Sequence, residues 1–139
     1  MDEVYGRRWA QRFIGLGDWI RGNIPTTINS DHMIGTDPDH SMNSFNPFLL
    51  MSIAISRRND RGQILGEHQK ISRQDALRCY TSTAAYLSFD EPRKGSLEPG
   101  KLADLVVIDR DFLACPEQDI PRIRVLQTMV NGKFVYTRE

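Results

Sequence analysis

The chain has 139 residues, and its 18 basic and 18 acidic side chains give a formal net charge of zero. A neutral chain offers no electrostatic reason to bind nucleic acid or an anionic membrane, so we expect neither partner. No apolar stretch approaches the ~20 residues of a membrane-spanning helix, and the first residues lack a signal-peptide pattern. Composition therefore disfavours nucleic-acid and membrane proteins and favours a cytoplasmic location.

The two cysteines, Cys79 and Cys115, lie far apart in the sequence and lack the spacing of metal ligands. We interpret them as free thiols of a cytosolic protein. Hydrophobic residues make up 40% of the chain, which is slightly low for a globular domain. This deficit suggests that another segment supplies part of the core.

The first predicted element is a helix over residues 3–22. Its apolar side chains recur at steps of three and four, which places them on one face. They are Tyr5, Trp9, Phe13, Leu16 and Ile20. We expect the aromatic side chains Trp9, Phe13 and Trp19 to be core residues. A short strand follows from Ile24 to Ser30, and residues 31–44 have the Asp, Gly, Pro, Ser and Asn content of a loop.

Two further helices are predicted in the middle of the chain. Asn46 and Pro47 are the residue types of a helix N-cap and first turn, and residues 48–58 are so apolar that this helix should be buried on most sides. Ser72 and Asp75 have the spacing of a capping box. The helix that they begin has an apolar stripe formed by Ala76, Leu77, Tyr80, Ala84 and Leu87.

A tight turn and a strand are predicted next. Residues 98–101 form the turn, because Pro99 presets one backbone angle and Gly100 accepts the positive φ that a type II turn needs. The apolar run at 102–109 is typical of a strand buried on both faces. Its one interruption, Asp104, needs partners, which the backbone amides of a neighbouring loop could supply.

The chain ends in a predicted β-hairpin. Asn131-Gly132 separates the runs 125–130 and 133–137, and this dipeptide is the strongest short hairpin signal in a sequence. Alternating helices and strands give way to strands alone near residue 90. We therefore predict an α/β part over residues 1–90 and a β part over residues 91–139.

Four segments of the chain form a recognisable series. They are Asn29-Ser30-Asp31, Ser72 to Ala85, Gly95 to Asp109 and Val125 to Tyr136. In the third, Gly95 and Leu97 precede Gly100-Lys101 and then Ala103-Asp104. Taken in this order, the segments resemble the C-terminal part of the amidohydrolase superfamily, and they are most similar to its family 3 branch.

That superfamily consists of metal-dependent hydrolases with a (β/α)8 barrel and a small β-sandwich beside it. The resemblance implies that residues 1–90 are the last β/α units of the barrel and that residues 91–139 are strands of a composite β-sandwich. The fold would then be incomplete, because a whole barrel needs ~250 residues. Family 3 members hydrolyse C–N bonds of non-peptide amides and formamides, so the expected substrate is a small amide-type molecule.

Asp31 is the candidate catalytic residue. It ends a predicted parallel strand, and barrels place catalytic groups at such strand ends. The resemblance implies that Asp31 binds or neighbours a divalent metal, zinc in the first instance, and accepts a proton from the attacking water. The histidines are His32, His40 and His68, without a His-x-His pair. The other ligands would be missing, so we expect no bound metal and no activity from this chain alone.

Other residue patterns have simpler interpretations. The loop from Asp31 to His40 is dense in possible zinc ligands, but its spacing matches no known motif. Arg57 and Arg58 suit the negative end of a helix dipole. Ser82 and Thr83 lack a nearby histidine and a Gly-x-Ser-x-Gly elbow, so we reject a nucleophile there.

Two functions remain open at this level. The first is the C-terminal segment of a metal-dependent hydrolase, and the second is a non-catalytic α/β module for interaction or oligomerisation. In the superfamily, the C-terminal strands share a sheet with strands from the N-terminus. Without these, the strands at 102–109 and 125–137 would have unpaired edges, so we expect the isolated chain to self-associate.

Overall fold

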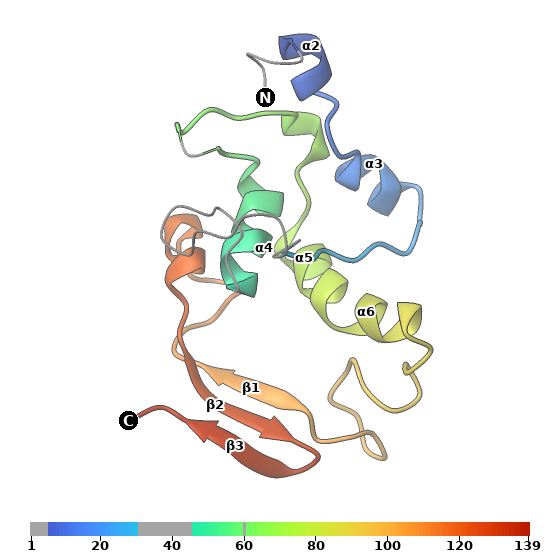
Figure 1. Cartoon of the computed structure of the whole chain (residues 1–139), viewed down its shortest axis with the longest axis vertical. Coiled ribbons are helices and arrows are strands. Elements are labelled where there is room, and N and C mark those ends of the chain that lie inside the picture. The colour runs from blue at the N-terminus through green and yellow to red at the C-terminus, as the bar shows by residue number, and fades with distance from the viewer. Residues whose placement is uncertain (1–5, 31–45, 60) are drawn as a thin grey trace.

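The computed structural model describes residues 6–30, 46–59 and 61–139. Short helices and a small antiparallel sheet form two regions of an elongated molecule (Figure 1). The helices are α2 (Arg7–Ala10), α3 (Leu16–Arg21), α4 (Pro47–Ser56), η1 (Glu67–Gln69), α5 (Arg73–Tyr80), α6 (Ser82–Leu87) and η2 (Glu117–Arg122). The strands are β1 (Leu105–Ile108), β2 (Val125–Val130) and β3 (Lys133–Thr137), in the spatial order β1-β2-β3. No described helix has the length and apolar character to cross a membrane.

Helix α4 lies at the centre of the hydrophobic core. It is apolar around its whole circumference and packs against both α5 and η2. The buried core residues are Leu16, Phe48, Met51, Ala54, Ile55, Ile71, Ala76, Phe112, Ile120 and Ile123. A helix without a polar face is stable in water when neighbours cover it, and the prediction of a largely buried helix here is confirmed. The core takes residues from both sides of residue 90, and the proposed division there stays a prediction.

Both predicted helix caps are present. The side-chain oxygen of Asn46 accepts a hydrogen bond of 3.0 Å from the backbone N–H of Phe48, and Pro47 occupies the first turn of α4. The Asn46 amide also donates to the carbonyl of Pro121, at 2.9 Å, which ties α4 to η2. In α5, the Ser72 hydroxyl accepts from the N–H of Asp75 at 3.0 Å.

The predicted helix over residues 3–22 is divided in two. Ile14 adopts φ 54°, a left-handed conformation in which a helix cannot continue, and α2 and α3 lie on either side of it. The predicted apolar face is divided as well, because Leu16 is buried and Ile20 packs against the core, whereas Trp9 lies at the surface. Trp9 is 44% exposed and Trp19 is 43% exposed, so the expectation that they are core residues is wrong.

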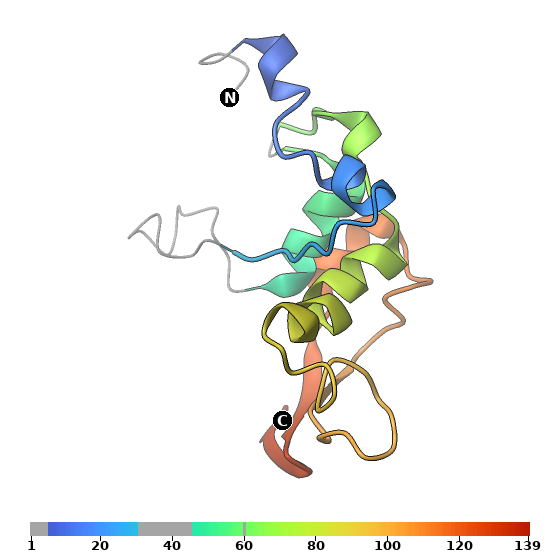
Figure 2. The ribbon, with the colours of Figure 1, turned by 90° about the vertical axis from the view of Figure 1, so that its right-hand side faces the viewer.

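Two other predicted elements differ from the structure. Residues 24–30 form no strand. The sheet of the described residues lies beyond the helices, too far from this segment to pair with it (Figure 2). The apolar stripe after Ser72 is shared by α5 and α6, which meet at Thr81 with φ −123° and ψ −94°. Ala76 on this stripe is fully buried, whereas Leu77 and Leu87 are exposed.

The sheet is less buried than the sequence indicates. Strand β1 covers Leu105–Ile108, and Val106 and Val107 are 52% and 39% exposed, so the prediction of a strand buried on both faces is wrong. All five residues of β3 are exposed. The apolar residues of a strand indicate which side chains must be buried. Within the described residues, the segments that would cover these side chains are missing.

Both predicted turns are confirmed. Gly100 has φ 92°, and Lys101 donates its N–H to the carbonyl of Glu98 at 3.2 Å. Asn131 and Gly132 have φ 49° and 74°, as a two-residue hairpin turn of type I′ requires. Asp104 accepts a 2.7 Å hydrogen bond from the N–H of Asn131, so a loop amide does satisfy it, although the carboxylate is exposed rather than buried.

Gly95 is the glycine of the motif segment with the tightest surroundings. Its φ is 94°, and a Cβ placed there would lie 2.6 Å from the Cβ of Ala85 on α6. We expect Gly95→Ala to lower the free energy of unfolding by about 2–4 kcal/mol, the sum of left-handed strain and overpacking. Urea denaturation measures it. Gly62→Ala is the matched control, because Gly62 has φ 74° and open space around it. Equal losses at both positions would contradict the packing argument.

Asp104 gives a second stability prediction. Because its carboxylate is exposed, Asp104→Leu should lower the free energy of unfolding by about 0.5–1.5 kcal/mol, the range of an ordinary hydrogen bond. Asp104→Asn retains an acceptor oxygen and serves as the control. Hydrogen exchange of the Asn131 amide should accelerate in the leucine variant and stay slow in the asparagine variant. An unchanged exchange rate in both variants would refute the assigned hydrogen bond.

Candidate functional site

The candidate residue Asp31 lies outside the described residues, as do His32, His40 and the rest of the loop between them. The structure describes the segment that leads to it, residues 24–30. Ile28 of this segment packs against the core around α4. The described segment thus ends one residue before Asp31 in the sequence, and the role of Asp31 stays a prediction.

Two hydrogen bonds between Asp18 of α3 and Gln69 of η1, here called the Asp18 clamp, hold α3 in place just before residues 24–30. The side-chain amide of Gln69 donates to the Asp18 carboxylate at 2.6 Å, and its oxygen accepts the Asp18 backbone N–H at 3.0 Å. Gln69 is 2% exposed, so its two hydrogen bonds satisfy a polar group that would be costly to bury alone. Arg21 adds bonds to the Asp18 carboxylate and to the carbonyl of His68.

The clamp also explains the glycine in α3. A Cβ on Gly17 would lie 2.9 Å from the Cα of Gln69, so the two backbones approach as closely as they do because residue 17 has no side chain. The hydrogen bond from Gln69, followed by that from Arg21, lowers the pKa of the Asp18 carboxyl below its ordinary value. Sequence reasoning missed Gln69, because a glutamine in a polar stretch carries no local signal of a distant partner.

Arg57 links α4 to the N-terminal segment. Its guanidinium donates to the carbonyl of Phe13 at 2.8 Å and to that of Leu65 at 3.0 Å. Neither carbonyl belongs to α4, so these bonds tie the end of the helix to neighbouring segments, and the helix-dipole role expected of Arg57 stays a prediction. Partial burial lowers the pKa of this guanidinium below its ordinary value, and it stays charged because arginine begins so high.

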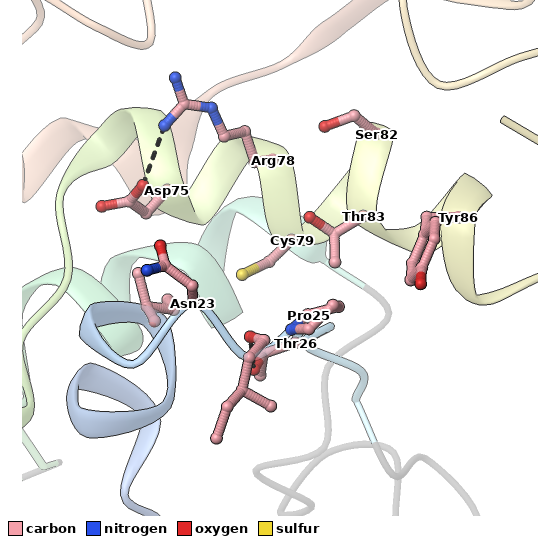
Figure 3. A pocket seen from close by; sticks show the side chains of 11 residues that line it. Asn23, Pro25, Thr26, Asp75, Arg78, Cys79, Ser82, Thr83 and Tyr86 are labelled. Carbon is pink, nitrogen blue, oxygen red and sulfur yellow. Dashed lines mark hydrogen bonds and ion pairs between the residues drawn. The ribbon is translucent and has the colours of Figure 1, made fainter.

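An open cavity of about 390 Å³ lies between the segment after α3 and the helices α5 and α6 (Figure 3). Its walls are Ile20, Asn23, Ile24, Pro25 and Thr26 on one side, and Asp75, Arg78, Cys79, Ser82, Thr83 and Tyr86 on the other. The thiol of Cys79 points toward the segment that carries Asn23 and Pro25 (Figure 3). Arg78 and Asp75 form an ion pair of 3.1 Å at the edge.

The cavity lacks the chemistry of nucleophilic catalysis. Burial, followed by the nearby Asp75 carboxylate, raises the pKa of the Cys79 thiol, which keeps it protonated and a poor nucleophile. Ser82 and Thr83 line the wall, but none of the described lining residues is a histidine. Cys79 and Cys115 are both free thiols, as predicted.

The described residues do not fit a metal ion. Nowhere in residues 6–30, 46–59 and 61–139 do three His, Cys, Asp or Glu side chains gather closely enough to hold one. His68 lies in η1 with an exposed side chain, and its carbonyl is engaged by Arg21. A site with three such ligands would therefore need residues outside the described part of the chain.

Comparison with known proteins decides the family. Residues 4–136 match the sequence model of amidohydrolase family 3. The chain belongs to this family. It is 34% identical over 115 residues to the N-substituted formamide deformylase of Arthrobacter pascens. It is also 32% identical over 112 residues to Protein LONG AFTER FAR-RED 3 of Arabidopsis thaliana.

The two relatives are much longer than this chain. The alignments cover 83% and 78% of this chain but 21% and 19% of the relatives. No solved structure gives a significant match. Family membership confirms the resemblance drawn from the four sequence segments, and the mixed helices and three-stranded sheet are compatible with an α/β amidohydrolase piece.

The Asp18 clamp yields a pH prediction. A carboxyl whose pKa is lowered by folding stabilises the fold above its unfolded pKa, and that contribution is lost as pH falls through the folded value. Wild type should therefore be more stable than Asp18→Asn at neutral pH. The difference should begin to shrink as pH falls below about 4 and should vanish only below the lowered pKa of the folded state. Urea denaturation across this range measures it. Glu91→Gln, which removes a charge from an exposed loop, should show no such convergence.

Proposed function

We propose that the chain is the C-terminal part of a metal-dependent hydrolase that cleaves C–N bonds in small, non-peptide amides or formamides. The observation that carries this is the family match over residues 4–136, with an N-substituted formamide deformylase among the relatives. The chain corresponds to about a fifth of such a protein. In this proposal, residues 1–90 are the last units of a (β/α)8 barrel and residues 91–139 are strands of a composite β-sandwich.

In the complete protein, Asp31 is the catalytic residue contributed by this chain. Its carboxylate accepts a proton from the water that attacks the amide carbon, which requires a base within hydrogen-bond reach of that water. The core contact of Ile28 and the clamp of Asp18 on Gln69 support this role, because they fix the segment that ends at Asp31. A flexible base would lose the orientation that such a proton transfer needs.

A divalent metal, zinc in the first instance, is proposed as the cofactor of the complete protein, with Asp31 among its ligands. Bound metal makes water acidic enough to supply hydroxide near neutral pH. The free thiols Cys79 and Cys115 support a cytoplasmic location.

The alternative function is a non-catalytic interaction module. The observation in its favour is the wide exposure of the sheet, in which Phe134 and Val135 are 56% and 62% exposed. The two functions differ in what they require of Asp31. A module tolerates its replacement, whereas a hydrolase does not.

A chimera tests the hydrolase proposal. Residues 23–136 of this chain would replace the matching segment of the Arthrobacter pascens N-substituted formamide deformylase. Formate release from an N-substituted formamide is then measured. We expect Asp31→Asn to lower turnover by about 10³-fold or more, as loss of a base or a metal ligand does. Asp39→Asn, a like change in the same loop of the sequence, is the control and should leave turnover within about threefold.

The isolated chain supplies the second arm of the experiment. Purified residues 1–139 should release no formate with or without added zinc, since the described residues provide no metal site. Turnover by the isolated chain that Asp31→Asn abolishes would mean that the site is complete without further ligands. A folded, active chimera that ignores Asp31→Asn would refute the assignment of Asp31.

A further inference from the structure

The tip of the β2–β3 hairpin carries a chemically reactive pair of residues. Asn131 and Gly132 form the turn, and both are exposed. A Cβ placed on Gly132 would meet no atom within 4 Å, so the space around this residue is open. An asparagine side chain reacts most readily with the next backbone nitrogen when glycine follows it, because glycine has no side chain to hinder the approach. The turn therefore combines a reactive pair with free access for water.

The reaction of such a pair needs water and no other reagent. The backbone nitrogen of Gly132 attacks the side-chain carbonyl carbon of Asn131 and forms a bond to it. The bond from that carbon to the side-chain nitrogen breaks, and this nitrogen leaves as ammonia with the proton that the Gly132 nitrogen gives up. Water then opens the resulting succinimide ring at either carbonyl, which leaves aspartate or isoaspartate at position 131.

Hydrogen bonds to the segment before β1 restrain the turn. The N–H of Gly132 donates to the carbonyl of Ala103 at 3.2 Å, and the N–H of Asn131 donates to the Asp104 carboxylate at 2.7 Å. The first bond engages the nitrogen that must attack, and the second fixes the residue that it attacks. The reaction therefore requires the turn to open locally, which costs less free energy than global unfolding.

We propose that Asn131 is a site of spontaneous deamidation and that the hydrogen bond to Asp104 limits its rate. The product loosens the turn. Isoaspartate lengthens the backbone by one carbon, where a type I′ turn requires a left-handed conformation at both positions. Aspartate adds a carboxylate to the residue whose N–H bonds that of Asp104, and like charges repel. This inference is independent of the proposed hydrolase function, because it involves neither Asp31 nor a metal.

Peptide mapping by mass spectrometry tests the site. The purified chain is kept at mildly alkaline pH, in buffer and in concentrated guanidinium chloride. We expect the mass increase of an amide-to-acid change at Asn131 in both, and a faster increase in guanidinium chloride, where the turn is absent. Asn23 is the internal control, because it is exposed with φ 56° but precedes Ile24, whose branched side chain hinders the attack. An unmodified Asn131 in buffer, or equal modification of Asn131 and Asn23, would overturn the proposal.

Variants of Asp104 test the control of the rate. Asp104→Leu removes the acceptor and should raise the rate of deamidation in buffer about two- to tenfold, as the loss of one ordinary hydrogen bond allows. Asp104→Ala removes the same acceptor without adding a large apolar side chain, and circular dichroism establishes which variants are folded. Asp104→Asn keeps an acceptor oxygen and should stay near the wild-type rate. An unchanged or lower rate in a folded variant without the acceptor would refute the role of Asp104.

Discussion

The burial of α4 is the constraint on which the rest of the described structure depends. This helix has no polar face, so its stability requires cover on every side. Helix α5 and Ile71 cover one part, while η2 and the flanking Phe112 and Ile123 cover another. Segments more than 40 residues apart are thereby held together. The sheet is attached to the helices through η2 and through Ile108 of β1 and Val125 of β2, which pack against the same core.

Polar contacts decide how the remaining pieces attach to this core. Asn46 caps α4 and also holds Pro121, so one side chain begins the central helix and positions its neighbour. Gln69 and Arg57 do the same for the N-terminal segment, through Asp18 and the carbonyl of Phe13. Residues 23–26 follow α3 and lie beside α5 and α6. None of the side chains that make these links belongs to a recognised motif.

The exposure of the sheet and of the N-terminal aromatics has a common cause. Val106, Phe134, Val135 and Trp9 are all large apolar side chains that the described residues leave in solvent. Such exposure is costly in a monomer when it is continuous, and family membership places this chain among proteins about five times as long. Segments outside the described residues can supply the missing cover.

The sequence alone determined the features that depend on neighbouring residues. The caps at Asn46 and Ser72, the turn at Gly100 and the hairpin at Asn131 are each set by the backbone preferences of one or two residues, and all four were predicted correctly. The family was also readable, because its motif segments are local. Tertiary structure decided what depends on distant partners. It divided the first helix at Ile14, left residues 24–30 without a partner strand among the described residues, and left β1 exposed. A strand forms only where another segment pairs with it, and an apolar face is buried only where another segment covers it. The Asp18 clamp is also decided by tertiary structure, because its partner Gln69 is 51 residues away in the sequence.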